Sequence, residues 1–192
     1  NFPSTELSAL EDFYYSTNGS YWDWGPDDVH WNFSGNPNPC SEHWYGVGCS
    51  ATEHVSILSL SDFNLHGSIP SSISALTFLN YLYLYDNQLF GAIPSSLGNI
   101  SSLQHLYLFG NNLNGTIPFE LSSLTQLLDL DLDANALTGL IPPSLGNLHR
   151  LVQLDLSENR LNGTIPASLG NLISLQTLYL YDNNLNGTIP SA

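Results

Sequence analysis

The chain has almost no positive charge. None of its 192 residues is lysine, Arg150 and Arg160 are the only strong cations, and 17 carboxylates bring the formal net charge to −15. Nucleic-acid phosphates are neutralised by clustered Lys and Arg side chains, and anionic membrane surfaces attract the same residues. The composition therefore excludes nucleic acid as a direct partner and argues against membrane contact by this segment. A cationic peptide, a metal ion or an uncharged glycan stays open as a partner, although net charge also simply favours solubility.

Methionine and long apolar runs are absent as well. A membrane-spanning helix needs roughly 18 or more consecutive apolar residues, so we expect no transmembrane segment. Residue 1 is asparagine, and we therefore expect a processed or excised piece from which any signal peptide has been removed. The length suits one domain with a sizeable core.

Only two cysteines are present, Cys40 and Cys49, and they lie close together. Such a pair in an otherwise cysteine-free chain predicts one local disulfide formed in an oxidising compartment. Six N-x-S/T sequons agree with that compartment. Their asparagines are Asn18, Asn32, Asn99, Asn114, Asn162 and Asn186. We expect an extracellular, N-glycosylated protein; the alternative is that the recurring N-G-T merely suits a turn.

A 24-residue pattern recurs without slippage from residue 55 to the C-terminus. It reads L-x-x-L-x-L-x-x-N-x-L-x-G-x-I-P-x-x-L-x-x-L-x-x. Its copies begin at Val55, Leu79, Leu103, Leu127, Leu151 and Leu175. A fixed period of this length indicates stacked coils that bury a shared core only because neighbours cover one another. Such proteins usually present a surface, so binding is a better expectation than catalysis.

Each part of the repeat has a structural interpretation. The L-x-L pair predicts a short strand with its leucines inward and the residue between them outward. An asparagine follows each strand from coil two onward, and its amide can bond the backbone of adjoining coils. The G-x-I-P segment suits a turn and an extended stretch, and the last segment suits a turn of 3₁₀ or helix.

Residues 1–54 carry no repeat but contain all four tryptophans. The spacing of apolar residues predicts a helix from Ser4 to Tyr15, with Glu6 among the residues outside the core. A solenoid needs an atypical terminal unit to cover its first coil. We therefore interpret residues 1–54 as an N-terminal cap with a tryptophan-rich core, and residues 55–192 as six repeats, the last one incomplete.

These motifs resemble the leucine-rich repeat family, in particular its plant-type subclass with L-x-G-x-I-P. The segment PCSEHWYGVGC, which ends at Cys49, resembles the cysteine-paired cap of that family, and Leu10 to Trp22 resembles a cap motif, L-x-x-x-Y-x-x-T-x-G-x-x-W. The resemblance implies an α/β solenoid: a right-handed superhelix with a parallel sheet on the concave side and short 3₁₀ or turn segments on the convex side. Members include receptor-kinase ectodomains, receptor-like proteins and polygalacturonase inhibitors. They usually bind through outward residues of the concave strands.

The outward strand positions form aromatic and acidic fields on this expected concave face. The binding residues predicted there are Tyr81, Tyr83, Tyr85, His105, Tyr107, Phe109, Asp129, Asp131, Asp133, Asp155, Tyr179 and Tyr181. Exposed aromatic rings suit a sugar or the apolar side chains of a protein or peptide. The alternative is that tyrosine packs well on strands against cross-strand neighbours.

The acidic field places Asp131 and Asp155 in one column on adjoining strands. Carboxylates that close raise one another's pKa unless a cation intervenes. A cationic peptide, a calcium ion or a positively charged neighbour would relieve the repulsion; solvent-screened carboxylates with nothing bound are the alternative. We expect no catalytic residues, no cofactor and no dedicated metal site, because the carboxylates are expected on regular exposed strands and the histidines have no ligand spacing.

Two further hypotheses come from the repeat itself. The last repeat ends midway, and an uncovered coil could stack on the cap of another copy, which makes head-to-tail self-assembly the alternative function. Ice binding would need a flat, regular array. The turn column that could supply one reads Ser68, Ala92, Thr116, Leu140, Thr164 and Thr188. Its alanine and leucine interrupt the array and argue against ice binding.

Overall fold

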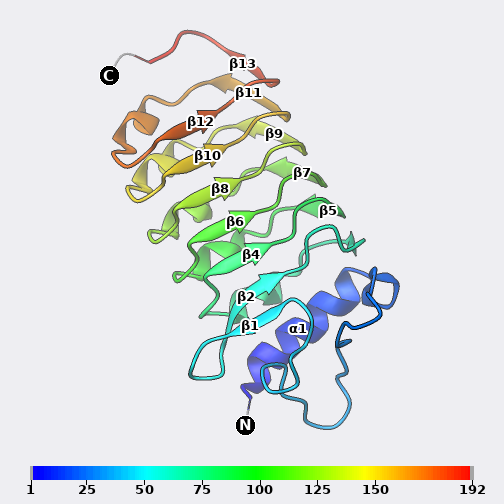
Figure 1. Cartoon of the computed structure of the whole chain (residues 1–192). Helices are drawn as coiled ribbons and strands as arrows, with labels where there is room; N and C mark the ends of the chain where they lie inside the picture. The colour runs from blue at the N-terminus through cyan, green and yellow to red at the C-terminus, as the bar shows by residue number, and fades with distance from the viewer. Residues whose placement is uncertain (1, 191–192) are drawn as a thin grey trace.

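Stacked coils form the body of the protein in a computed structural model that describes residues 2–190 (Figure 1). One strand from each of the six coils and β1 from the N-terminal segment form a seven-stranded sheet in the order β1-β2-β4-β6-β8-β10-β12. The strands are β1 (Val47–Cys49), β2 (Val55–Ser59), β4 (Tyr81–Tyr83), β6 (His105–Tyr107), β8 (Asp129–Asp131), β10 (Gln153–Asp155) and β12 (Thr177–Tyr179). All neighbours pair in parallel except β1, which is antiparallel to β2. The expected solenoid with a parallel sheet is confirmed.

The repeat period sets the register of this sheet. Leu82 pairs with Leu106, Leu106 with Leu130, and Leu130 with Leu154, so each strand is offset from the next by one repeat. These four leucines are fully buried, whereas the residues on either side of them are half-buried on the other face, apart from the buried Asp155. The leucine columns therefore hold the coils together, and the other face of the sheet is left to the variable residues.

A second parallel sheet, which the repeat pattern did not predict, runs through the L-x-G segment of each coil. Its order is β13-β11-β9-β7-β5-β3. The strands are β3 (His66–Gly67), β5 (Gln88–Ala92), β7 (Asn112–Thr116), β9 (Ala136–Leu140), β11 (Arg160–Thr164) and β13 (Asn184–Asn186). Most of the column read above as a turn (Ala92, Thr116, Leu140 and Thr164) instead ends these strands. Repeated hydrogen bonding between equivalent segments makes a strand out of a sequence that looks like a turn by itself.

The repeated asparagines tie the coils together as predicted. Asn111 is 8% exposed, and its Oδ1 accepts the N–H of Leu89 in the preceding coil at 3.0 Å. Its Nδ2 donates to the carbonyls of Leu84, Leu108 and Phe109 at 3.0–3.1 Å. Asn87, Asn135, Asn159 and Asn183 repeat this pattern. One side chain thus satisfies buried backbone groups of two coils.

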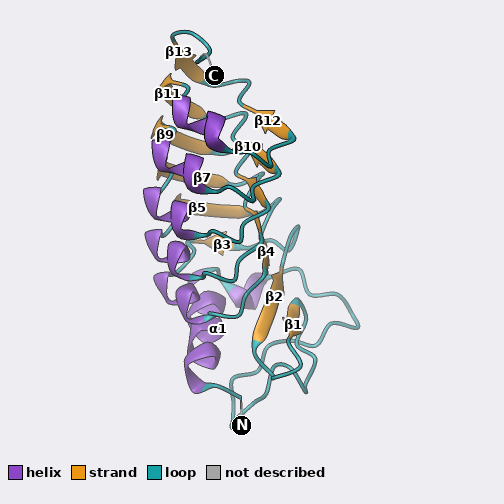
Figure 2. Cartoon of the chain, turned by 90° about the vertical axis from the view of Figure 1, so that its left-hand side faces the viewer, coloured by secondary structure: helices purple, strands orange, loops and turns teal. Residues whose placement is uncertain are grey.

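Short 3₁₀ helices line the face opposite the seven-stranded sheet (Figure 2). They are η2 (Ser71–Ala75), η3 (Ser95–Asn99), η4 (Phe119–Ser123), η5 (Pro143–Asn147) and η6 (Ala167–Asn171). Each follows the proline of I-P, whose ring fixes the backbone at the start of the turn. The expected 3₁₀ segments are confirmed.

The N-terminal segment covers coil one. Helix α1 (Ser4–Ser16) packs against η2, and a single 3₁₀ turn, η1 (Gly19–Tyr21), follows it. Trp22, Trp31 and Trp44 are buried, and the centroids of the Trp22 and Trp31 rings lie 5.0 Å apart. The tryptophans therefore form a packed aromatic core, as expected of a cap, and the predicted helix is confirmed to within one residue at its end.

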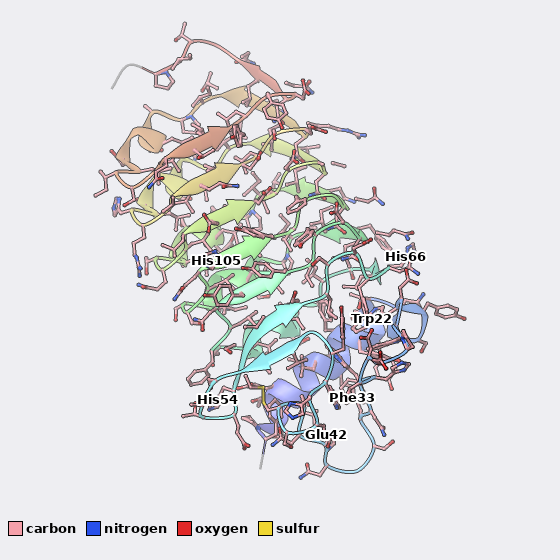
Figure 3. The ribbon with its side chains drawn as sticks, in the orientation of Figure 1. Trp22, Phe33, Glu42, His54, His66 and His105 are labelled. Atoms are coloured by element: carbon pink, nitrogen blue, oxygen red, sulfur yellow. A yellow bond between two sulfur atoms is a disulfide. The ribbon has the colours of Figure 1, made fainter. Side chains whose placement is uncertain are left out.

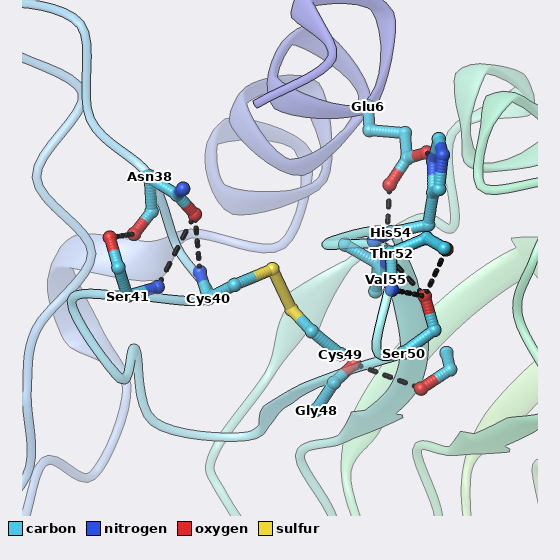
Figure 4. The surroundings of a disulfide bond; sticks show 11 residues. Glu6, Asn38, Cys40, Ser41, Gly48, Cys49, Ser50, Thr52, His54 and Val55 are labelled. Atoms are coloured by element: carbon cyan, nitrogen blue, oxygen red, sulfur yellow. Dashed lines mark hydrogen bonds and ion pairs between the residues drawn. A yellow bond between two sulfur atoms is a disulfide. The ribbon is translucent and has the colours of Figure 1, made fainter. Parts of the chain in front are cut away.

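The interface between α1 and coil one corrects one prediction. Glu6, expected outside the core, is only 3% exposed. Its Oε2 accepts the N–H of Val55 at 2.8 Å, and its Oε1 pairs with Nδ1 of His54 (Figure 4). A buried carboxylate is tolerated here because it satisfies the first N–H of β2 and meets a histidine. The Cys40–Cys49 disulfide is present as predicted and closes the loop that precedes β2.

Candidate functional site

Six aromatic side chains stack in pairs on the outer face of the seven-stranded sheet; we call them the aromatic ladder. The centroids of the paired rings lie 4.5–4.9 Å apart, with angles of 4–24° between their planes. The pairs are Tyr81–His105, Tyr83–Tyr107 and Tyr85–Phe109. Parallel pairing of β4 with β6 places each ring beside the ring one repeat later. The structure therefore brings these predicted residues together as one half-buried aromatic surface.

The aromatic ladder lies directly beside the acidic residues of β8. Nδ1 of His105, labelled in Figure 3, lies 2.6 Å from Oδ2 of Asp129 on the next strand. The atoms are close enough for an ion pair, although their angle is not that of a directed hydrogen bond. Burial, with a smaller contribution from the charge of Asp129, raises the pKa of Tyr107 to about 12. The phenol of Tyr107 thus stays protonated and can act as a hydrogen-bond donor beside the carboxylates.

Asp131, Asp133, Asp155 and Ser157 form the acidic cluster. Asp131 and Asp155 occupy one column on β8 and β10, as predicted. However, Asp155 is only 8% exposed, so the expectation that this carboxylate lies on an exposed strand position is wrong; Ser157 beside it is fully buried. The Ser157 hydroxyl lies 2.9 Å from Oδ1 of Asp133 and also contacts Oδ1 of Asp155, which accepts the Ser157 N–H at 2.9 Å. A hydroxyl has one hydrogen, so it can donate to only one of the two carboxylates at a time.

Negative charge in the acidic cluster is energetically unfavourable in the folded protein. Burial, together with the charges of Asp155, Asp133 and Asp129, raises the pKa of Asp131 to about 6, although the hydrogen bond from the Asp133 N–H opposes this shift. The sequence predicted that the neighbouring carboxylates raise one another's pKa; for Asp131 they do so, but burial is the larger cause. Within residues 2–190 the ion pairs join carboxylates only to His54 and His105, so no arginine neutralises the cluster.

The raised pKa of Asp131 predicts a pH-dependent stability. The folded protein holds this proton more tightly than the unfolded chain, whose pKa is near 3.8. The stabilisation of the fold by this proton is therefore complete below pH 3.8 and is lost as the pH rises through about 6. Asp131→Asn should raise the stability at about pH 7.5 by roughly 1 kcal/mol, a figure reduced for partial solvent screening, and should have little effect near pH 4.

Thermal unfolding of wild type and Asp131→Asn at both pH values measures this difference. The matched control is Asp86→Asn, an exposed carboxylate after β4. A stabilisation by Asp131→Asn that is equal at both pH values would contradict the assignment.

The other predicted residues lie apart from this surface. Tyr179 and Tyr181 on the last coil are 46% and 53% exposed, and two strands of the sheet, β8 and β10, separate β12 from the aromatic ladder. All six sequon asparagines are exposed, and none lies on the seven-stranded sheet. The last described coil also exposes Leu178 and Ile189, while self-assembly through it stays a prediction.

The described part of the chain has neither a group of side chains placed to bind a metal ion nor a helix suited to span a membrane. Residues 2–190 include no group of three or more His, Cys, Asp or Glu side chains placed to hold a metal ion. Over the same residues, no helix has both the length and the apolar character needed to cross a bilayer.

Comparisons with known proteins identify the repeats. A family model described as leucine rich repeat matches residues 125–185, and a second one matches 78–100 and 102–124. Comparison with curated proteins finds no match. Among solved structures, the ectodomain of the receptor kinase GASSHO1/SCHENGEN3 from Arabidopsis thaliana, in complex with CASPARIAN STRIP INTEGRITY FACTOR 2, is 39% identical with a TM-score of 0.86. That alignment covers 96% of this chain but 22% of the ectodomain, so the chain spans about a fifth of that relative's length.

Two further structures extend the comparison. A plant ice-binding protein is 31% identical with a TM-score of 0.81, over 96% of this chain and 57% of that one. The ectodomain of the receptor kinase SOBIR1 from Arabidopsis thaliana is 30% identical with a TM-score of 0.80, over 99% of both chains. The shared repeats, the cysteine-paired cap and this full-length alignment lead to one conclusion: the chain belongs to the leucine-rich repeat family, and its structural neighbours include plant receptor-kinase ectodomains.

Proposed function

We propose that this chain is an extracellular, glycosylated recognition module that binds a protein or peptide through the aromatic ladder and the acidic cluster. The observation that best supports this proposal is that the two groups of residues form one continuous surface. Stacked rings on β4 and β6 adjoin carboxylates on β8 and β10 on one face of one sheet. The ectodomain of GASSHO1/SCHENGEN3 was crystallised with a partner, which supports binding as the activity of this fold.

The chemistry of the face favours a cationic ligand with apolar or aromatic groups. Half-buried rings with hydroxyl tips offer large contact area at little entropic cost, as interface hot spots do. The acidic cluster carries buried charge that no arginine neutralises in the described part of the chain, and burial already makes ionisation of Asp131 unfavourable. A Lys or Arg side chain of the ligand would relieve that repulsion and set its orientation on the sheet.

The sequons fit this assignment. Asn114 and Asn162 occupy a column of the second sheet that also holds His66, Phe90 and Thr138, so the fold does not demand asparagine there. Their side chains are exposed, as are the threonines two residues later. These features support glycosylation as the reason for N-G-T at these positions. Because every sequon lies off the seven-stranded sheet, glycans would leave the recognition face uncovered.

Binding to arrayed peptides and glycans of varied charge tests the proposal. We expect cationic, aromatic-containing peptides to be retained. Replacing Tyr83 and Tyr107 together by alanine should weaken their binding more than tenfold, as loss of hot-spot aromatics does. Asp131→Asn combined with Asp155→Asn should remove the preference for positive charge. Phe119→Ala is the matched control, since Phe119 is 65% exposed on η4, away from this sheet.

Two outcomes would overturn the proposal. One is that the tyrosine variant binds as well as the Phe119→Ala control. The other is that only neutral glycans are retained, independently of the aspartates.

The likeness to a plant ice-binding protein does not extend to a regular flat array in this chain. Phe90 and Leu140 are 45% and 60% exposed on the outer face of the second sheet, among exposed threonines and asparagines. Bulky apolar side chains break the even spacing that an ice surface requires. The recognition face on the seven-stranded sheet therefore remains the better supported site.

A further inference from the structure

A pocket of about 320 Å³ lies in the N-terminal cap, away from the recognition face. It is enclosed on one side by Glu11, Tyr14 and Tyr15, which share one face of α1, and on the other by residues 31–34 of the loop that follows. Phe33, labelled in Figure 3, lies on this loop beside the helix. The pocket is thus formed where a helix and an irregular loop meet.

One sequon forms part of this pocket. Asn32 and Ser34, its asparagine and its hydroxyl residue, both line the pocket and are both exposed. Oδ1 of Asn32 accepts the N–H of Ser34 at 3.0 Å, an Asx turn that fixes the direction of the side-chain amide. This bond leaves Nδ2, the atom to which a glycan attaches, free of that turn. A sugar added to Asn32 would begin its path within the pocket.

The lining suits the first sugars of a glycan. The ring of Tyr15 is 67% exposed, and its centroid lies 6.3 Å from that of Phe33 and 5.4 Å from that of Tyr14. Exposed aromatic faces of this kind stack against the C–H face of a sugar, and a tyrosine adds a hydroxyl at the edge. The Glu11 carboxylate can accept hydrogen bonds from sugar hydroxyls or from an N-acetyl N–H. The pocket thus has a mostly polar lining that includes a hydrogen-bond acceptor, with the exposed ring of Tyr15 as its apolar face.

Asn162 provides the contrast. It is exposed on β11, where its strand partners are Leu140 and Asn184, and no aromatic residue is paired with it. A glycan at Asn162 would point into solvent, whereas one at Asn32 would have a surface to lie against.

We propose that the cap pocket is an intramolecular carbohydrate site that holds the proximal sugars of an N-glycan on Asn32. This inference rests on the glycosylation part of the proposed function. It assigns a role to Tyr15, which is 67% exposed on α1, and to Phe33, which is partly buried beside it. The bound glycan would hold the loop around residues 31–34 against α1 and so stabilise the cap.

Site-resolved deglycosylation tests the proposal on the protein secreted from a eukaryotic host. Native protein is treated with peptide N-glycosidase F, and release at each sequon is followed by mass spectrometry. We expect release from Asn32 to be at least about tenfold slower than from Asn162, because a stacked core is shielded, and Tyr15→Ala should remove most of the difference. Equal native rates at the two sites, or a Tyr15→Ala variant that keeps the full difference, would overturn the proposal.

Thermal unfolding gives a second measurement. Ser34→Ala abolishes the sequon but keeps the backbone N–H of the Asx turn. In the glycosylated protein it should lower the melting temperature by about 2–4 °C, whereas in protein made in a bacterial periplasm it should have no effect. Thr164→Ala, which removes the Asn162 sequon, is the matched control and should not differ between hosts. An equal effect of Ser34→Ala in both hosts would contradict a role for the glycan.

The outcomes separate this proposal from the one on which it rests. Absence of glycan from every sequon overturns the cap site and the glycosylation part of the proposed function, whereas binding by the sheet face is tested separately by the peptide array. Glycan at Asn162 but not at Asn32 overturns the cap site alone and leaves the glycosylated recognition module in place.

Discussion

Replacing Asn111 by alanine should destabilise the protein by about 3–5 kcal/mol. The substitution removes one acceptor and the amide donors that serve buried backbone groups of coils two and three. Each buried polar group left without a partner costs about 1–3 kcal/mol, and water cannot replace the amide without access to the coil interior. Urea denaturation followed by far-UV circular dichroism measures the loss.

The adjacent residue provides the control. Asn112 has the same chemistry and lies in the same coil, but its side chain is exposed on β7. Asn112→Ala should therefore change the stability by no more than about 0.5 kcal/mol, as surface substitutions usually do. If the two variants unfold at similar urea concentrations, the asparagine ladder does not hold the coils together as argued.

This pair of asparagines shows what the sequence could reveal about the fold. A residue that recurs at one phase of a repeat performs the same structural task in every coil, so the role of Asn111 could be predicted from period alone. The same reasoning found the leucine columns and the 3₁₀ segments. It missed the second sheet because L-x-G-x-I-P looks like a turn within one coil, and only stacking supplies the hydrogen bonds that make it a strand.

The candidate site was harder to predict because it lies at the variable positions. The repeat phase correctly placed Tyr83 beside Tyr107 and Asp131 beside Asp155. It could not give burial, since neighbouring side chains of different size decide how much water reaches each outward residue. Asp155 was expected on an exposed strand but is only 8% exposed, and Ser157 is fully buried against two carboxylates. Alternation along a strand predicts the direction in which a side chain points, whereas the exposure of that side chain depends on its neighbours across the sheet.

The acidic cluster connects stability with recognition. Ionisation of Asp131 gains little from the fold itself, since burial raises its pKa and no ion pair within residues 2–190 joins an arginine to the cluster. Groups that cost stability in the free protein are typical of sites whose compensation comes from a ligand. A single substitution that makes the protein more stable at neutral pH and weakens its binding of a cationic peptide would show that the cluster lowers stability and favours binding.

Irregular segments give no repeat from which to predict a residue's role, and Glu6 is the clearest case. Its position among polar residues of an amphipathic helix suggests exposure, yet it is buried where α1 meets coil one. Only the docking of the helix onto the start of β2 reveals its task, because the N–H that it accepts comes from Val55, in a different element.

Glu6→Ala should therefore detach the cap at a cost of about 3 kcal/mol. The substitution leaves the Val55 N–H without its acceptor and His54 without its carboxylate, and loss of one member of a buried pair typically costs about 3–5 kcal/mol. The partial exposure of His54 places the expected value at the lower end of that range. Glu6→Gln keeps an acceptor oxygen for Val55 and should lose about 1 kcal/mol.

The cap carries its own optical probe, because all four tryptophans lie within residues 22–44. Urea unfolding followed by tryptophan fluorescence thus reports on the cap, while circular dichroism reports mainly on the repeats. We expect Glu6→Ala to lower the fluorescence midpoint at least as far as the dichroism midpoint, since each unit of a solenoid is stabilised by its neighbours. Asp12→Ala, an exposed carboxylate on the same helix, is the control. Equal midpoints for Glu6→Ala and Asp12→Ala would show that the buried carboxylate does not anchor the cap to coil one.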